Sequence, residues 1–244
     1  MRPTVDALAA RTRVLTFSLA DEPSSGAAFD PAKGFDSYVD QVRHALEQKN
    51  ISRAVVCGVS YGGLVAATFA ARHPDLTCAL VLVSAIPPDW SPDARIRFYL
   101  RAPRLLAPLF MLASLRLFGE ILAAAGSPLK AIRQGLQQAW TVLTHMFSPL
   151  RMARRARLLE GLTLVPEIRT IASPTLIVVG DTTRDRVVPV SRTLEYTTLI
   201  PQAQTVKIPR SGHLGCMTQP DVFADLVVTF VRAHTDLPQG DHRG

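Results

Sequence analysis

Short, almost entirely apolar runs recur along this chain, and each has the length of a buried strand. Residues 54–57, 77–85 and 175–180 are runs of this kind. Residues 13–19 and 205–208 are also interpreted as strands, the second because apolar and polar residues alternate in it. Near-continuous apolar strands are typical of a parallel sheet that is covered on both faces. The pattern therefore predicts such a sheet.

Helical patterns lie between these runs. Apolar residues recur every three or four positions in residues 35–48, and a similar pattern covers residues 63–70. Residues 222–231 are expected to form the last helix, and residues 5–10 a short first one. Strands that alternate with helices predict the α/β class, with helices on both faces of a mostly parallel sheet. Such sheets place their active sites at the carboxyl ends of the strands.

The alternation stops between residues 87 and 172, where no strand is evident and helical patterns follow one another. We interpret residues 87–172 as a helical cap inserted into the sheet domain, which then comprises residues 1–86 and 173–244. Prolines and glycines separate the helices expected in the cap. These helices are residues 94–100, 105–124, 129–144 and 149–162.

A serine lies at the turn between the strand at 54–57 and the helix that follows it. The chain there reads Gly58-Val59-Ser60-Tyr61-Gly62. A strand-to-helix turn of this kind holds its serine in a strained backbone conformation, and small residues two before and two after it allow close packing. The N–H groups at the start of the next helix favour a developing oxyanion. The alternative interpretation is a glycine-rich turn with an incidental serine.

Two further loops carry the groups that would activate this serine. The strand at 175–180 leads into a polar loop that contains Asp181 and Asp185, and His213 follows the strand at 205–208. A serine hydroxyl is a weak nucleophile until a base takes its proton, and an acid group orients that base. His213 is the candidate base, with a surface loop histidine as the alternative. Asp181 and Asp185 are both candidates for the acid, and Asp181 is also a candidate cap for its own loop.

Together, residues 58–63, residues 180–189 and the triplet Ser211-Gly212-His213 resemble the nucleophile elbow, acid loop and histidine loop of the α/β-hydrolase superfamily. The chain order serine, aspartate, histidine is also the order of that superfamily. The resemblance covers residues 13–233. It implies that Asp185 is the acid and that a cap covers the serine. It implies neither a metal nor an organic cofactor.

The chemistry implied by the resemblance is serine hydrolysis through an acyl-enzyme. Ser60 attacks, His213 transfers the proton, Asp185 orients His213, and the N–H of Tyr61 helps to hold the oxyanion. The expected substrate is a small, mostly apolar ester or related carbonyl compound, although carbon–carbon, amide and lactone cleavage and acyl transfer stay open. Apolar side chains of the cap either line its pocket or hold the cap together. They are Phe98, Leu105, Leu106, Phe110, Met111, Leu112, Trp140, Met146 and Phe147.

One part of the superfamily pattern is missing from this sequence. Its members ordinarily carry further strands before the one expected at 13–19, and one of these leads into a His-Gly loop that supplies a second oxyanion N–H. Residues 1–12 are too few for those strands and include no glycine. We expect that the natural chain starts upstream of Met1; a partner that covers the gap and a diverged protein are the alternatives. The gap also motivates a second hypothesis: a weakly active or inactive protein that binds a small apolar ligand or a partner.

Composition and charge narrow the classes of function. The chain has 244 residues, of which 48% are hydrophobic, and this supports a packed globular domain. A net charge of +7 favours anionic contacts, but only 7% of residues are aromatic and no nucleic-acid module is evident. Nucleic acid is therefore not an expected partner. Four arginines between residues 151 and 157 form a basic cluster, which we interpret as a solvated face. Contact of this cluster with a membrane surface is the least favoured hypothesis. The cluster consists of Arg151, Arg154, Arg155 and Arg157.

Cysteine usage and hydropathy bear on where the protein works. The three cysteines show neither a disulfide framework nor a metal-site spacing, and we expect Cys57 and Cys78 to be buried free thiols. Residues 1–6 lack the apolar core of a secretion signal. The most hydrophobic region, residues 105–125, is interrupted too often to cross a membrane. We therefore expect a cytoplasmic protein, whose oligomeric state the sequence does not indicate.

Overall fold

The computed structural model describes residues 1–108, 148–185 and 187–235. Two helices expected in the cap, 105–124 and 129–144, therefore lie largely or wholly outside the described residues, as do Phe110, Trp140 and the other apolar cap side chains between 109 and 147. The statements below concern the described residues.

Four parallel strands form a single sheet in the order β1-β2-β3-β4. The strands are β1 (Ala54–Val59), β2 (Thr77–Val83), β3 (Thr175–Val179) and β4 (Gln204–Lys207). Every side chain of β2 and β3 is buried, which is the reason for their unbroken apolar sequences. Their register brings Val59, Val83, Val178 and Lys207 to the same end of the sheet. The prediction of strands in these four places is confirmed.

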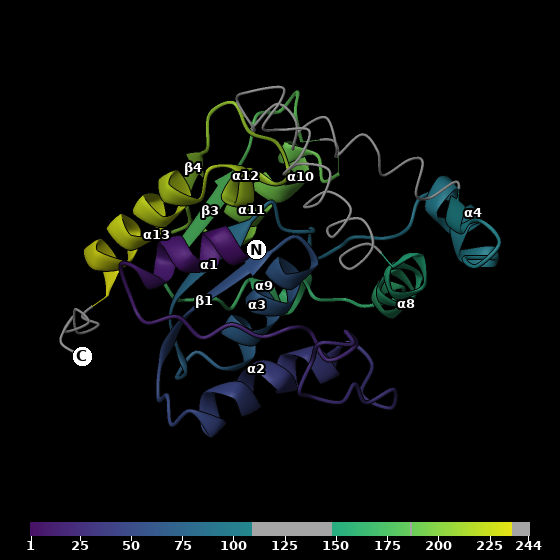
Figure 1. The fold of residues 1–244 in the computed structure, drawn as a ribbon, viewed down its shortest axis with the longest axis horizontal. Helices are drawn as coiled ribbons and strands as arrows, with labels where there is room; N and C mark the ends of the chain where they lie inside the picture. Colours follow the sequence, from purple (N-terminus) through teal and green to yellow (C-terminus); the bar gives the residue numbers. More distant parts are fainter. Residues whose placement is uncertain (109–147, 186, 236–244) are drawn as a thin grey trace.

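Helices cover both faces of the sheet, as the sequence predicted (Figure 1). One face carries α2 (Asp36–Gln48), α3 (Tyr61–Arg72), α9 (Val165–Ile168), α10 (Val190–Leu194) and α11 (Tyr196–Leu199). The other carries α1 (Arg2–Ala9), α12 (Gly215–Thr218) and α13 (Pro220–His234). Strand side chains alternate between the faces: Leu80 and Ile177 lie in the first hydrophobic cluster, and Val81 and Val178 in the second. The α/β class with two covered faces is confirmed.

The strand predicted at residues 13–19 is wrong, because the segment belongs to no sheet. A strand needs a hydrogen-bonded neighbour, and the described residues place none beside it. Side-chain bonds hold its end instead: Gln41 Nε2 donates to the carbonyl of Ser18 at 2.8 Å, and the amide of Ala20 donates to Gln41 Oε1 at 2.8 Å. Leu15 and Phe17 are left exposed.

Strand β1 lies at one edge of the sheet, and this changes the environment of Cys57. The prediction that Cys57 is buried is wrong, since the residue exposes surface to solvent, whereas Cys78 is buried as predicted. Desolvation by the nearby protein atoms nevertheless raises the pKa of the Cys57 thiol to about 12. A thiol with so high a pKa is a poor nucleophile at neutral pH, so the exposure of Cys57 does not suggest a reactive cysteine.

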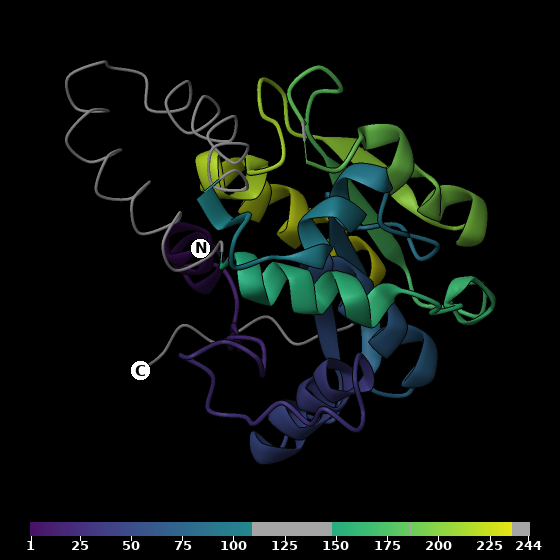
Figure 2. The same cartoon turned by 90° about the vertical axis from the view of Figure 1, so that its right-hand side faces the viewer.

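Two of the helices predicted in the cap, 94–100 and 149–162, lie within the described residues. They are α4 (Ala94–Arg101) and α8 (Pro149–Leu159), and each begins with a side-chain cap, from Asp93 and Ser148. Figure 2 brings α8 to the front of the molecule. The chain that follows α8 joins the main hydrophobic cluster through Leu159, Leu164, Ile168 and Ile171, which are all buried. The division of the chain into core and cap stays a prediction.

Candidate active site

Ser60 occupies a strained backbone conformation between β1 and α3. Its φ is 54° and its ψ is −118°, in a region that residues with a side chain rarely adopt. Three backbone hydrogen bonds hold it there: the amide of Ser60 donates to Val83, and its carbonyl accepts from Gly63 and Ile86. Because such strain costs about 1–3 kcal/mol, it persists only where the surrounding structure enforces it. The backbone at Ser60 is therefore set by its neighbours in β2 and α3.

The glycine two residues before Ser60 is required by close packing, but the one two residues after it is not. A Cβ atom on Gly58 would lie 2.1 Å from the backbone oxygen of Gly62. A Cβ atom on Gly62 would meet no atom within 4 Å. The sequence expectation that both positions must be small is therefore correct for Gly58 and wrong for Gly62. The reason is that the backbone of α3 crosses over Gly58, while Gly62 points away from the sheet.

Tyr61 follows Ser60 and is the first residue of α3. Its amide N–H therefore lies outside the hydrogen-bond ladder of the helix and is free of an intrahelical acceptor. Its ring is buried and meets two aromatic rings edge to face, with centroid distances of 6.0 Å to Phe35 and 5.6 Å to Tyr38. Burial raises the pKa of the Tyr61 phenol well above its usual range. The Tyr61 side chain is thus a packing element next to Ser60.

His213 and Asp185 form a buried hydrogen-bonded pair. His213 Nδ1 lies 3.2 Å from Asp185 Oδ2, and only 6% and 1% of their side-chain surfaces are exposed. Asp185 Oδ1 accepts from the amides of Val187 at 3.1 Å and Val188 at 3.0 Å. Burial alone would raise the pKa of Asp185. The hydrogen bond to His213, the charge of His213 and the two backbone amides outweigh burial, so the pKa of Asp185 is lowered. Since an ionised carboxylate only accepts, Nδ1 of His213 carries the hydrogen of this bond.

The other candidate acid, Asp181, makes different contacts. Lys207 Nζ lies 2.5 Å from Asp181 Oδ1, and Arg184 Nε lies 3.6 Å from Oδ2. The bond from Lys207 is the main reason why the pKa of Asp181 is lowered. The structure therefore pairs His213 with Asp185 and places Asp181 in an ion pair at the surface. An exposed ion pair of this kind contributes about 0–1 kcal/mol to stability.

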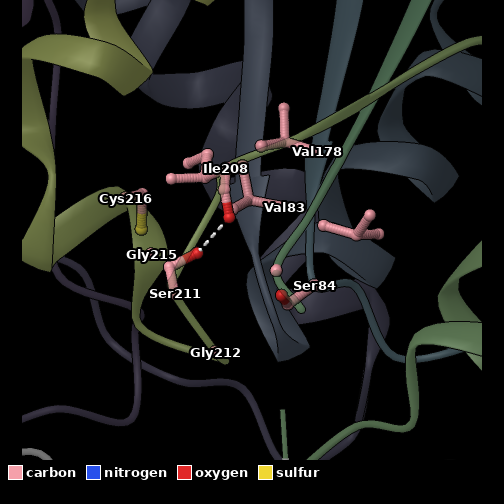
Figure 3. Close-up of a pocket in the computed structure, with 10 residues that line it drawn as sticks. Val83, Ser84, Val178, Ile208, Ser211, Gly212, Gly215 and Cys216 are labelled. Atoms are coloured by element: carbon pink, nitrogen blue, oxygen red, sulfur yellow. Dashed lines mark hydrogen bonds between the residues drawn. The ribbon is translucent and has the colours of Figure 1, made fainter. Parts of the chain in front are cut away.

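Backbone contacts hold the loop that carries His213. The Ser211 hydroxyl donates to the Ile208 carbonyl at 2.8 Å, and the Asp181 amide donates to the Ser211 carbonyl at 2.7 Å. Figure 3 shows the Ser211 hydroxyl turned toward Ile208, beside a narrow space under the strand ends that has no room for a water molecule. A Cβ atom on Gly180 would lie 2.4 Å from the Gly212 oxygen. This close packing fixes the histidine loop against the end of β3.

Ser60 and His213 lie at the same end of the sheet, because each follows the carboxyl end of a parallel strand, β1 and β4, which are the two outer strands of the described sheet. Among the described contacts, no hydrogen bond joins the Ser60 hydroxyl to His213. A catalytic hydrogen bond of this kind is often long or poorly aligned without substrate, so its absence does not exclude the pair. The structure thus joins His213 to Asp185 directly, and places Ser60 at the same end of the sheet.

Comparison with known proteins places this arrangement in a family. The sequence profile of the alpha/beta hydrolase family matches residues 2–226. The chain belongs to this family. Membership agrees with the resemblance seen in the sequence at the serine turn, the acid loop and the histidine loop. It describes the fold and the class of site, and leaves the reaction and the substrate open.

Individual relatives are distant in sequence. RutD from Rhizobium rhizogenes (strain K84 / ATCC BAA-868), whose name provisionally assigns it carbamate hydrolysis, is 22% identical over 96% of this chain and 88% of its own. A bromoperoxidase from Bacillus anthracis has a TM-score of 0.74 at 20% identity, covering 95% of this chain and 86% of that one. An esterase (EaEST) from Exiguobacterium antarcticum has a TM-score of 0.70 at 19% identity, covering 88% and 80%. At these identities the structures establish the fold alone.

Metal sites and membrane spans are two further features that bear on function. In the described part of the chain, no three His, Cys, Asp or Glu side chains gather as metal ligands would. Nor does any helix in those residues have the length and apolarity that a membrane span requires.

Proposed function

We propose that the protein is a serine hydrolase that forms an acyl-enzyme on Ser60. The observation that carries the proposal is the buried His213–Asp185 pair, which follows the carboxyl ends of β3 and β4, while the strained turn at Ser60 follows the carboxyl end of β1 in the same parallel sheet. A hydrogen-bonded histidine and carboxylate with low exposure are what a base for serine requires. Backbone strain lowers stability and is therefore found mainly at functional sites. A serine held in a strained turn between a strand and a helix is one such feature.

Each residue would have one role in the reaction. Nε2 of His213 takes the proton of the Ser60 hydroxyl as its oxygen attacks the substrate carbonyl, and later gives it to the leaving group. Asp185 keeps Nδ1 protonated and stabilises the imidazolium that forms. The Tyr61 N–H at the start of α3 donates to the oxyanion. Water then attacks the acyl-enzyme in the reverse sequence of proton transfers and frees Ser60.

The proposed substrate is a small, mostly apolar ester or related carbonyl compound. Apolar side chains in the described part of residues 87–172 support this choice, since Phe98 and Leu105 are exposed rather than buried. One of the similar structures is named an esterase, and RutD is named for a carbamate, which is also a carbonyl compound. A small-molecule substrate, without nucleic acid or a membrane as partner, is part of the same proposal.

Labelling by a fluorophosphonate tests the proposal, because this reagent reacts with activated serines. The wild-type protein should be labelled, and Ser60→Ala should not. Ser84 provides a matched control: it also follows a strand, is buried and has a positive φ of 41°. Ser84→Ala should therefore keep the labelling if Ser60 alone is activated. Labelling that survives in Ser60→Ala, or is absent from folded wild-type protein, would contradict the proposal.

A second candidate function is binding without turnover. The observation that favours it is the position of β1 at the edge of the sheet, where no neighbouring strand among the described residues adds a second oxyanion donor. Retention of a small apolar ligand by unlabelled, folded protein in equilibrium dialysis would support it. Rapid hydrolysis of short-chain p-nitrophenyl esters, lost in Ser60→Ala, would exclude it.

We also propose that the protein works in a reducing cytoplasm. All three of its cysteines are free thiols, which is the usual state there. Fractionation of the source cells with detection of the protein would test this. Recovery from a secreted or outer compartment would contradict it.

A further inference from the structure

Arg155 on α8 makes a buried ion cluster with two carboxylates far away in the sequence. Its Nε lies 3.1 Å from Asp21 Oδ2, its Nη2 lies 2.5 Å from Asp21 Oδ1, and Nη2 also lies 2.9 Å from Glu22 Oε1. The Arg155 side chain is 12% exposed and that of Asp21 is fully buried. The interpretation of the arginine cluster as a solvated face is therefore wrong for Arg155. The two partners are 134 residues apart in the sequence, so no local pattern connects them.

The same guanidinium also contacts the turn that holds Ser60. Its central carbon lies 5.4 Å from the centroid of the Tyr61 ring, within the range of a cation–π contact. Tyr61 is bonded directly to Ser60 and supplies the proposed oxyanion N–H. The Tyr61 ring also meets the rings of Phe35 and Tyr38 edge to face. A continuous set of contacts therefore runs from Asp21 through Arg155 to Tyr61.

Stability alone is a weak explanation for a buried ion cluster at this place. Removing charges from water is costly, and well-packed apolar side chains often stabilise a protein as much or more. A planar guanidinium that binds one carboxylate with two nitrogens has a fixed orientation, and it can hold a ring stacked against it. The cluster therefore fixes the orientation of the guanidinium and of the ring it contacts, which an apolar contact would not do.

We propose that Arg155 is a positioning residue for the reaction, acting through Tyr61. Held by Asp21 and Glu22, the guanidinium fixes the Tyr61 ring and so the direction of the Tyr61 N–H beside Ser60. Arg155 has no role in proton transfer. This inference rests on the proposed function. It adds a residue from α8, outside the elbow, acid and histidine loops, to the set that determines the rate.

The neighbouring arginine offers a matched control. Arg154 lies on the same helix and is exposed, and its described contact is with the Phe29 ring, at 5.7 Å from the ring centroid. Arg154→Ala removes the same charge from the same helix as Arg155→Ala and changes helix propensity by the same amount. Arg155→Lys keeps the charge but cannot bind Asp21 with two nitrogens of one plane. Asp21→Asn removes the charge of the partner without changing its size.

The test measures the rate of fluorophosphonate labelling and, with p-nitrophenyl butyrate, kcat and KM separately. All variants are assayed at a temperature where circular dichroism shows them folded. We expect Arg155→Ala to lower the labelling rate and kcat by roughly 10- to 100-fold, the range that a small misplacement costs. KM should change little, Asp21→Asn should show a smaller loss in the same direction, and Arg155→Lys should recover part of the rate. Arg154→Ala should match the wild type.

Two results would overturn this inference alone, and a third would overturn the proposed function with it. If folded Arg155→Ala is labelled as fast as Arg154→Ala, Arg155 has only a structural role and the proposed function stands. A rise in KM with kcat unchanged leads to the same conclusion. If the wild-type protein is not labelled at all, the proposed function and this inference fail together.

Discussion

The serine half and the histidine half of the candidate site are held in place by different means. Around Ser60 the contacts are made by backbone: three main-chain hydrogen bonds and the close approach of α3 to Gly58. Around His213 a side-chain bond to Asp185 orients the ring, and two amides hold the carboxylate. Both halves lie at the ends of parallel strands and are therefore positioned by the same sheet. The local contacts that support the two halves differ.

This difference has a consequence for how each half responds to mutation. A conformation enforced by backbone fails when a larger side chain is forced into it, and the whole turn then loses stability. The orientation of a side chain that depends on one hydrogen bond is lost when a single atom of that bond is replaced, and the packing around the side chain changes little. We therefore expect mutations on the histidine side to affect activity more than stability, and mutations of the elbow glycine to affect stability strongly.

The largest expected effect belongs to Asp185→Asn, the atom exchange on the histidine side. The amide would favour the wrong tautomer of His213, and the rate of fluorophosphonate labelling should fall by roughly 10⁴-fold, as for the same change in a serine protease triad. Asp181→Asn is the matched control in the same loop, and it should leave the rate within about twofold because an exposed ion pair contributes little. A larger loss in Asp181→Asn than in Asp185→Asn would reverse the assignment.

A smaller effect, on stability, is expected on the serine side. Gly58→Ala places a Cβ atom 2.1 Å from a backbone oxygen that cannot move without shifting α3. We expect it to lower the free energy of unfolding by about 3 kcal/mol, at the upper end of overpacking effects. Gly62→Ala enters open space in the first turn of α3 and should be neutral or slightly stabilising. Urea denaturation followed by circular dichroism measures both, and equal effects of the two variants would show that the close approach is absent.

The smallest expected effect is the pH dependence of the His213–Asp185 pair. The pKa of Asp185 is lower in the folded protein than in the unfolded chain, so folding stabilises its ionised form. This stability is fully present above the unfolded pKa of about 3.9 and is lost as the pH falls toward the folded pKa. The difference in unfolding free energy between wild type and Asp185→Asn should therefore be constant near pH 5 and shrink by pH 3. Urea denaturation midpoints measured between pH 5 and pH 3 test this difference in unfolding free energy. A difference that grows as the pH falls would contradict the prediction.

Much of the site was predictable from local pattern, and the reason is visible in the structure. The apolar runs at 77–85 and 175–180 became β2 and β3, in which every side chain is buried, because burial on both faces accommodates such runs. The serine turn was recognisable because Gly58 and Ser60 are required by geometry within five residues of chain. The position of His213 in a loop of the site was predictable because a recognisable strand precedes it. The choice between Asp181 and Asp185 could not be made from residues alone, since both follow the same strand.

The features that pattern did not reveal all depend on distant partners. Arg155 reads as one of several surface arginines until Asp21 is brought to it across 134 residues. A signal was present, because Asp21 and Glu22 form an acidic pair that a basic cluster later in the chain could match. The pattern does not say which arginine of the cluster meets the pair. Only the packing of α8 on the core selects Arg155.

The amino-acid sequence by itself determined which segments are apolar enough to form the sheet, where the chain must turn sharply at Ser60, and which family the protein belongs to. Tertiary structure decided whether a strand-like segment becomes a strand. Residues 54–59 find β2 beside them, while residues 13–19 have an equally suitable pattern and no strand beside them in the described part of the chain. Strand pairing and burial of charge both require groups from elsewhere in the chain. Local pattern states what a segment is able to form, and the availability of partners decides what it does form.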